Sequence, residues 1–259
     1  MAPDHQRADE HLHLDRARAE SFGAVATEYD EHRPTYPEHL IAAVLAAVAG
    51  SAVEVLDVGS GTGIAARQLR AAGANVLAVE PDPAMARLAG AAGMPIDVAT
   101  FEEWDPAGRS FDVISFAQSF HWVDPQAAAR KAWDLLHPGG ALALYWNRFT
   151  ELDPPRERIS EVDARHLTEV PSARPSEERE ESVDGLLRDI GFTVERLTFR
   201  EERRYSRDAW LDLLFTYSRY LVLDPDTRAR ARADLAALVG PEGVRIENDA
   251  LLVLAHKPA

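Results

Sequence analysis

One nine-residue stretch limits the fold of this chain more than any other. In Val55–Gly63 the end of an apolar run (Val53 to Val58) is followed by three glycines at alternate positions, and a helical pattern follows at once from Ile64. Glycine allows positive φ and lets a ligand approach the backbone without a Cβ in the way. The free N–H groups of the new helix point into the same space. We therefore predict a strand, a tight turn and a helix that together bind a ligand.

The spacing of these glycines and two nearby acids indicate the ligand. A dinucleotide fingerprint is G-x-G-x-x-G, whereas the third glycine here, Gly63, comes one place earlier. A phosphate-binding P-loop needs a lysine that this turn lacks. Asp57 precedes the turn and suits a cation better than a pyrophosphate, and Glu80 ends the next apolar run, where it can accept hydrogen bonds from ribose hydroxyls. We infer a nucleoside that carries an amino or sulfonium group.

These residues resemble those of a known family. Asp-Val-Gly-Ser-Gly-Thr-Gly at 57–63, Val-Glu-Pro-Asp at 79–82 and His-Pro-Gly-Gly at 137–140 are similar to class I S-adenosylmethionine-dependent methyltransferases. The resemblance extends from about Phe22 to the C-terminus. The run Gln-Ser-Phe-His-Trp-Val-Asp at 118–124 resembles the methyltransferase type 11 and trans-aconitate methyltransferase-like branch. The resemblance implies an enzyme with S-adenosyl-L-methionine as cofactor and S-adenosyl-L-homocysteine as product.

The order of the hydrophobic patterns predicts an α/β fold. Helical patterns alternate with apolar runs that indicate strands at 53–58, 75–80, 95–99, 111–116, 141–146, 192–199 and 251–255. We expect a Rossmann-like three-layer α/β/α sandwich with a seven-stranded, mostly parallel sheet and helical cap insertions. The resemblance implies that the last strand is antiparallel and lies between the fifth and the sixth.

We expect three functional parts along the chain. An N-terminal tail and cofactor lid would occupy 1–36, with a frayed or loosely helical tail over 1–20. The S-adenosylmethionine-binding Rossmann-like core would comprise 37–150 with 182–200 and 243–259. A helical substrate cap would comprise 151–181 and 201–242.

Composition excludes several classes of function. The chain has no cysteine, which rules out disulfides, thiolate zinc sites and a cysteine nucleophile. Its net charge of −15 argues against a nucleic-acid partner, which would need a basic face. No apolar run reaches membrane-spanning length, and the first twenty residues lack the apolar core of a signal peptide. We expect a cytoplasmic monomer or homodimer that acts on a small molecule, without a metal, a nucleic acid or a membrane.

The predicted cofactor-binding residues lie in the glycine turn, at strand ends and in the lid. The resemblance implies that Tyr29 closes on the methionine side and that Arg33 pairs with the cofactor carboxylate, although a surface helix that packs aromatic rings on the core remains an alternative. Thr100 stands where relatives often have an acid, so the adenine contact could come from its hydroxyl, from backbone or from a neighbour. The other candidates are Asp57, Gly59, Ser60, Gly61, Gly63, Glu80, Pro81, Phe101, Ala117 and Gln118.

The residues after the fourth strand are the candidates for chemistry, since ligands of open α/β sheets bind at the carboxyl ends of strands. We predict His121 and Gln118 as catalytic residues. His121 could be a general base, a donor to a substrate carboxylate or a structural residue. The predicted substrate-binding residues are Trp122, Asn147, Arg148 and Tyr217.

The predicted reaction is methylation of a small molecule, with oxygen of a carboxylate or hydroxyl as the acceptor, in metabolism or natural-product biosynthesis. A carboxylate nucleophile needs no base, whereas a hydroxyl or an amine needs one. Three alternatives stay open: an N- or C-methyltransferase, a nicotinamide-dependent oxidoreductase, and a non-catalytic binding module of the same fold.

Overall fold

A computed structural model describes residues 20–50, 52–167 and 177–259. The expectations for residues 1–19, and for 168–176 within the predicted cap, lie outside this part of the chain. The described residues form two compact units. Unit 1 comprises 20–34, 148–167 and 200–249, and unit 2 comprises 35–50, 52–147, 177–199 and 250–259.

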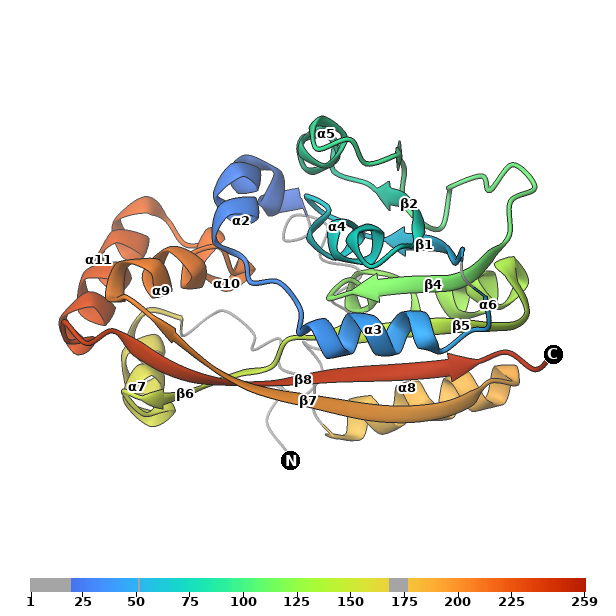
Figure 1. Cartoon of the computed structure of the whole chain (residues 1–259). Helices are drawn as coiled ribbons and strands as arrows, with labels where there is room; N and C mark the ends of the chain where they lie inside the picture. Colours follow the sequence, from blue (N-terminus) through green and yellow to red (C-terminus); the bar gives the residue numbers. More distant parts are fainter. Residues whose placement is uncertain (1–19, 51, 168–176) are drawn as a thin grey trace, which may run out of the picture. The chain divides into compact units, whose positions relative to one another are not determined.

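Unit 2 contains an open sheet in the strand order β3-β2-β1-β4-β5-β8 (Figure 1). The strands β1 to β5 are parallel to their neighbours, and β8 runs antiparallel to β5. The bounds are β1 Glu54–Val58, β2 Asn75–Glu80, β3 Ile96–Val98, β4 Phe111–Ala117, β5 Leu136–Trp146 and β8 Val244–His256. The strand β7 (Thr193–Tyr205) also pairs with β8, which confirms that the last strand lies beside the fifth strand and next to the sixth predicted one.

Helices cover both faces of this sheet because its buried strands present apolar side chains in both directions. Val55 and Val113 point to a cluster with residues of α3, α4 and α5. Leu56 and Ile114 point to the opposite cluster, with residues of α6 and α8. The bounds are α3 Glu38–Ala46, α4 Ile64–Ala71, α5 Pro83–Ala91, α6 Pro125–Leu135 and α8 Glu177–Ile190. The predicted three-layer Rossmann-like architecture is confirmed.

Unit 1 is built mainly from helices around a separate apolar cluster. Its strand β6 (Phe149–Asp153) pairs antiparallel with the first part of β8. The helical elements are η3 Glu20–Val25, α2 Ala26–His32, α7 Arg156–His166, α9 Arg207–Leu214, α10 Ser218–Leu221 and α11 Pro225–Leu238. No helix in the described ranges is long and apolar enough to cross a membrane.

The observed strands differ from the prediction in number and length. The described residues contain eight strands rather than seven, because the additional strand β6 overlaps the start of the polar stretch 151–181, which was expected to be an insertion. Both β7 and β8 are longer than the apolar runs at 192–199 and 251–255. In the first part of β8 buried residues alternate with half-buried ones, so only one face of the strand needs apolar side chains.

Candidate cofactor and acceptor site

The glycine turn joins β1 to α4 as predicted, and all three glycines have positive φ. Gly59 donates to the Val79 carbonyl at 2.8 Å, which fixes the turn against β2. A Cβ on Gly59, at φ +64°, would lie 2.6 Å from the Ser119 Cβ. A Cβ on Gly61, at φ +58°, would meet no atom within 4 Å. Gly59 is therefore required for packing, whereas Gly61 borders open space that a ligand can approach.

Three buried polar atoms around this turn have no hydrogen-bond partner in the described part of the chain: Asp57 Oδ2, Ser60 Oγ and Thr62 Oγ1. Leaving a buried polar atom unpaired costs about 1–3 kcal/mol. Native proteins keep few such atoms, and each calls for an explanation. A carboxylate oxygen and two hydroxyls beside an open glycine match a ligand that brings amino and hydroxyl groups.

The Asp57 carboxyl is fully buried, and its surroundings shift its pKa in opposite directions. Burial raises its pKa to about 7, and the nearby Glu80 charge adds to the rise. The Ser115 hydroxyl donates to Asp57 Oδ1 at 2.8 Å and opposes the rise. A group at the threshold of ionisation near neutral pH responds strongly to an incoming cation.

Glu80 ends β2 with its carboxylate directed at the glycine turn. Its Oε2 accepts from the Gly61 N–H at 2.8 Å, and its Oε1 accepts from the Asp82 N–H at 2.9 Å. Burial raises the pKa of Glu80 to about 7, and both backbone hydrogen bonds lower it. Each carboxylate oxygen can accept a further hydrogen bond, so the ribose role stays a chemically sound prediction.

Other predicted cofactor residues lie along the same strand ends. Pro81 is exposed and Ala117 is half-buried. The Thr100 hydroxyl accepts from the Glu103 N–H at 3.3 Å and so caps the turn after β3. Phe101 is buried and packs edge-to-face on Phe116, with ring centroids 5.5 Å apart. Their contacts with a cofactor stay predictions.

The segment after β4 contains a strained backbone position. Gln118 has φ +57° and donates its backbone N–H to the Tyr145 carbonyl at 2.9 Å. A residue with a Cβ pays about 1–2 kcal/mol for this left-handed conformation, and such strain clusters at functional sites. His121 and Trp122 follow in η4 (Phe120–Trp122), both half-buried, with ring centroids 4.8 Å apart. The predicted catalytic segment thus begins with an uncommon backbone conformation, while the roles of its side chains stay predictions.

Asn147 directly follows β5, and its side-chain amide donates to the Thr35 carbonyl at 3.3 Å. Arg148 belongs to unit 1, where its guanidinium donates to the Asp249 carboxylate at 2.7 Å and to the Asp249 carbonyl at 2.8 Å. These contacts favour an anchoring role for both residues, and substrate binding by either one stays a prediction.

Tyr29, Arg33 and Tyr217 belong to unit 1 and lie together there. The Arg33 guanidinium stacks on the Tyr217 ring at 3.9 Å and lies 4.7 Å from the Tyr29 ring centroid. It also donates to the Thr216 hydroxyl at 2.8 Å and to the Thr216 carbonyl at 3.0 Å. Burial raises the pKa of Tyr217, and the Arg33 charge opposes this rise. The guanidinium is therefore held in place by two aromatic rings and a threonine.

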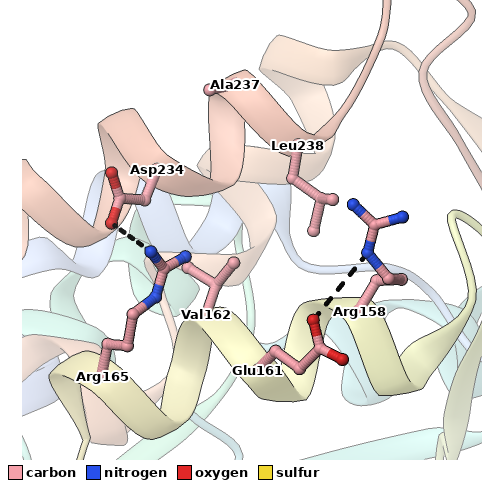
Figure 2. Close-up of a pocket in the computed structure, with 7 residues that line it drawn as sticks. All are labelled: Arg158, Glu161, Val162, Arg165, Asp234, Ala237 and Leu238. Atoms are coloured by element: carbon pink, nitrogen blue, oxygen red, sulfur yellow. Dashed lines mark ion pairs between the residues drawn. The ribbon is translucent and has the colours of Figure 1, made fainter.

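Unit 1 also has a surface hollow of about 540 Å³ between α7 and α11 (Figure 2). Figure 2 shows two ion pairs on its walls, Arg165 with Asp234 at 3.7 Å and Arg158 with Glu161 at 3.9 Å. These charges pair with one another at an open surface, where such pairs contribute little energy. The candidate site is therefore assigned to the strand ends of unit 2.

Sequence reasoning missed the roles of Ser115 on β4, Ser119 after β4 and Tyr145 on β5. Ser115 donates to Asp57, Ser119 donates to the Val58 carbonyl, and the Tyr145 hydroxyl lies 2.8 Å from Ser115 Oγ. The signal was present for Ser115, a polar residue within the otherwise apolar run at 111–116. Its pairing with Asp57 depends on strand register, which the run alone does not reveal.

The open parallel sheet, the glycine turn and the acids at strand ends define a Rossmann-like α/β protein, a fold that binds ligands at the carboxyl ends of its strands. A family model described as a methyltransferase domain matches residues 29–197. The chain therefore belongs to the methyltransferase domain family, which confirms its resemblance to class I S-adenosylmethionine-dependent methyltransferases. The narrower similarity to the trans-aconitate branch stays a prediction.

Individual relatives agree with this membership. The uncharacterized methyltransferase Rv3342 of Mycobacterium tuberculosis is 41% identical over 130 residues, which are 49% of this chain and 52% of that protein. The chain thus spans about half the length of these curated relatives. A ubiquinone biosynthesis O-methyltransferase of Methylobacterium nodulans is 36% identical over 96 residues, 34% of this chain and 39% of that protein.

Solved structures share the fold. A structure described as a type II methyltransferase from Anaeromyxobacter dehalogenans matches with a TM-score of 0.63 and 25% identity, over 88% of this chain and 99% of that one. A phosphoethanolamine N-methyltransferase of Haemonchus contortus, in complex with S-adenosylhomocysteine, matches with a TM-score of 0.53 and 15% identity, over 92% of this chain and 58% of that one. The second likeness shows the fold alone.

Proposed function

We propose that this chain transfers a methyl group from S-adenosylmethionine to a small-molecule acceptor. Family membership supports the cofactor, and one observation in the structure supports its place. That observation is the set of three unpartnered buried atoms, Asp57 Oδ2, Ser60 Oγ and Thr62 Oγ1, in and next to a turn whose Gly61 borders open space. The donors and acceptors of an adenosyl amino acid would satisfy these atoms.

The residues of unit 2 have side chains suited to such a cofactor, which would have to displace the atoms that now cover Asp57 and Thr62. Asp57 would face the amino group, and Glu80 would accept from the ribose hydroxyls through its remaining lone pairs. Gly61 would allow close approach because its Cβ position is open. Bound S-adenosylmethionine supplies a methyl group on a sulfonium, which is already a strong electrophile. The task left to the protein is to orient the acceptor and exclude water.

We further propose an oxygen acceptor. The short match to an O-methyltransferase supports this choice, while the structural likeness to an N-methyltransferase keeps nitrogen as the second candidate. For a hydroxyl, His121 would act as general base after β4. For a carboxylate, His121, Gln118 and Trp122 would only donate hydrogen bonds that position the acceptor.

The roles of Tyr29 and Arg33 toward the cofactor, and of Tyr217 toward the acceptor, are proposed from the family resemblance. Arg33 has donors suited to a carboxylate, and its contacts with Thr216 and Tyr217 reduce the entropy lost when it binds an anion. The same reasoning gives Arg148 a weaker case, since the Asp249 carboxylate and carbonyl already accept from its guanidinium.

Calorimetric titration with S-adenosylhomocysteine tests the proposal, with a nicotinamide dinucleotide as the matched control. We expect saturable binding of the first ligand alone. Small acids, phenols and amines would then be screened as acceptors with isotopically labelled S-adenosylmethionine. Binding of the dinucleotide instead would revive the oxidoreductase alternative, and binding of neither would support a non-catalytic module.

A further inference from the structure

A line of three buried polar side chains crosses the sheet beneath the glycine turn. Tyr145 on β5, Ser115 on β4 and Asp57 on β1 are each fully excluded from solvent. The Ser115 Oγ lies 2.8 Å from the Tyr145 hydroxyl and 2.8 Å from Asp57 Oδ1. The three groups therefore form one continuous hydrogen-bonded chain.

Strand register explains why these residues meet. In the parallel pairing Asp57 lies opposite Ser115, and Ser115 lies opposite Ala143. Tyr145 is two residues beyond Ala143, so it points to the same face of the sheet. That face is otherwise apolar and is covered by α3 and α4.

The hydrogen bonds of the chain have a defined direction when Asp57 is ionised. The Ser115 hydroxyl has a single proton, which it donates to Asp57 Oδ1. It must then accept from the Tyr145 hydroxyl, which becomes the terminal donor. Asp57 Oδ1 is thereby fixed, while Oδ2 is left without a partner among the described residues.

The far end of the chain is held by its neighbours. The Tyr145 ring packs edge-to-face on the Tyr36 ring, with centroids 4.8 Å apart and an interplanar angle of 82°. The Gln68 side chain on α4 receives from the Tyr36 N–H and donates to the Tyr36 carbonyl, each at 2.9 Å. The hydrogen-bonded chain is thus connected, through Tyr36, to the helix α4 that begins at the glycine turn.

Stability alone does not explain this arrangement. A buried polar network with one unsatisfied member is less favourable than an apolar core of the same volume. The carboxylate oxygen that lacks a partner, Oδ2, belongs to the residue two positions before the first glycine of the turn. Local departures from the most stable arrangement are expected at functional sites.

We propose that Ser115 and Tyr145 are positioning residues that hold Asp57 so that its Oδ2 accepts the amino group of the cofactor's amino-acid portion. This inference rests on the proposed function and extends it to two residues that do not themselves touch the cofactor. It predicts selective loss of affinity for ligands that have the amino group.

The electrostatics of the site agree with this role. Ser115 and the Ala66 N–H favour the charged form of Asp57, whereas burial and the Glu80 charge favour the neutral form. Removing the Ser115 hydroxyl would raise the pKa of Asp57 further, so that the carboxyl becomes neutral near pH 7 and attracts an ammonium group less. Tyr145 acts through Ser115, so its hydroxyl has the smaller effect.

Two ligands separate positioning from general damage. S-adenosylhomocysteine has the amino-acid portion, and 5′-methylthioadenosine shares its adenosine and thioether but lacks that portion. The variants are Ser115→Ala and Tyr145→Phe, which retains the ring packing. Ser110→Ala, at an exposed serine before β4, is the matched control. Affinities are measured by calorimetry on the full chain, with thermal unfolding as a check on folding.

We expect Ser115→Ala to weaken S-adenosylhomocysteine binding by about tenfold or more, as loss of a hydrogen bond to a charged group implies. Tyr145→Phe should have a smaller effect in the same direction, and neither should change 5′-methylthioadenosine affinity by more than about twofold. Equal losses for both ligands, or no loss for either, would overturn the inference. If Ser115→Ala does not fold, Tyr145→Phe decides alone. Failure of the unmodified protein to bind either ligand would instead overturn the proposed function, and the inference with it.

Discussion

Replacing Gly61 by alanine separates ligand approach from fold stability at the glycine turn. Gly61 has φ +58°, and an added Cβ would meet no protein atom within 4 Å. The only cost to the folded state is the left-handed conformation, which is about 1–2 kcal/mol for a residue with a Cβ. We therefore expect Gly61→Ala to fold with a modest loss of free energy of unfolding. If the cofactor occupies this space, the methyl group should weaken binding by about 10- to 100-fold, as overpacking of about 1–3 kcal/mol implies.

Gly59→Ala is the matched contrast, because Gly59 has a similar φ of +64° but a filled environment. Its new Cβ would lie 2.6 Å from the Ser119 Cβ. Overpacking of about 1–3 kcal/mol is added to the conformational cost, so the total loss of stability is about 2–5 kcal/mol. The double variant Gly59→Ala, Ser119→Gly should recover part of the overpacking, since the two changes are in direct contact.

Urea unfolding gives the stability of each variant, and calorimetry with S-adenosylhomocysteine gives its affinity. The reasoning requires Gly59→Ala to be the less stable of the two variants and Gly61→Ala to be a stable protein that binds poorly. Wild-type affinity in Gly61→Ala would show that the ligand does not occupy the open space. Equal destabilisation by both changes would refute the distinction between a packed and an open glycine.

Three further predictions concern the acids and the histidine. Glu80→Ala should weaken S-adenosylhomocysteine binding by about 30-fold or more, because the ligand loses hydrogen bonds that it donates to a charged acceptor. Glu80→Gln, which retains an oxygen acceptor, should lose less affinity. Unchanged affinity in Glu80→Ala would contradict the assignment of Glu80 to the ribose. If His121 is a general base, His121→Ala should lower turnover of an acceptor from the screen by about 10²- to 10⁴-fold. The affinity for S-adenosylhomocysteine should stay constant. Full activity in this variant would indicate a structural role for His121. Burial raises the pKa of Asp57 and Glu80 to about 7 from 3.8 and 4.5, so the folded ligand-free state binds more protons than the unfolded state between these limits. The free energy of unfolding of the ligand-free protein should accordingly contain a contribution that falls as pH rises through this window, and Asp57→Asn should reduce that contribution in urea unfolding. S-adenosylhomocysteine should bind more tightly near pH 8 than near pH 6, because an ammonium group favours the ionised carboxylate. A flat pH profile of affinity would contradict this.

The sequence pattern predicted the elements that surround the turn because local chemistry determines them. The apolar runs before Gly59 and Glu80 correspond to β1 and β2, and both end where the polar residues begin. Asp82 and Asp124 each accept from backbone N–H groups at a helix start and precede a proline at the first helical position. Such caps are visible in sequence, so the strand-to-helix junctions were predictable.

Unit 1 was harder to predict because its elements bury only part of their surface. The helix α7 has a polar sequence, yet Ile159 and Val162 are buried in the cluster of unit 1. Two apolar residues three positions apart are a weak periodic signal among charges. The first part of β8 was missed for a related reason, since Val244 and Ile246 alternate with polar residues and form no continuous apolar run.

The chain from Tyr145 to Asp57 shows where sequence reasoning reaches its limit. Asp57, Ser115 and Tyr145 each lie on a strand that the sequence predicts, but the glycine motif indicates a binding role for Asp57 alone among them. The two oxygens of Asp57 differ because Ser115, 58 positions further along the chain, donates to only one of them. Ser115 is in turn hydrogen-bonded to Tyr145, which lies a further 30 positions along the chain. A one-residue shift in the register of β4 would turn Ser115 to the opposite face and leave both oxygens without that donor. The chemical asymmetry of the carboxylate is therefore a property of sheet register, and a substitution that changes register should alter ligand selectivity even when every residue of the glycine motif is retained.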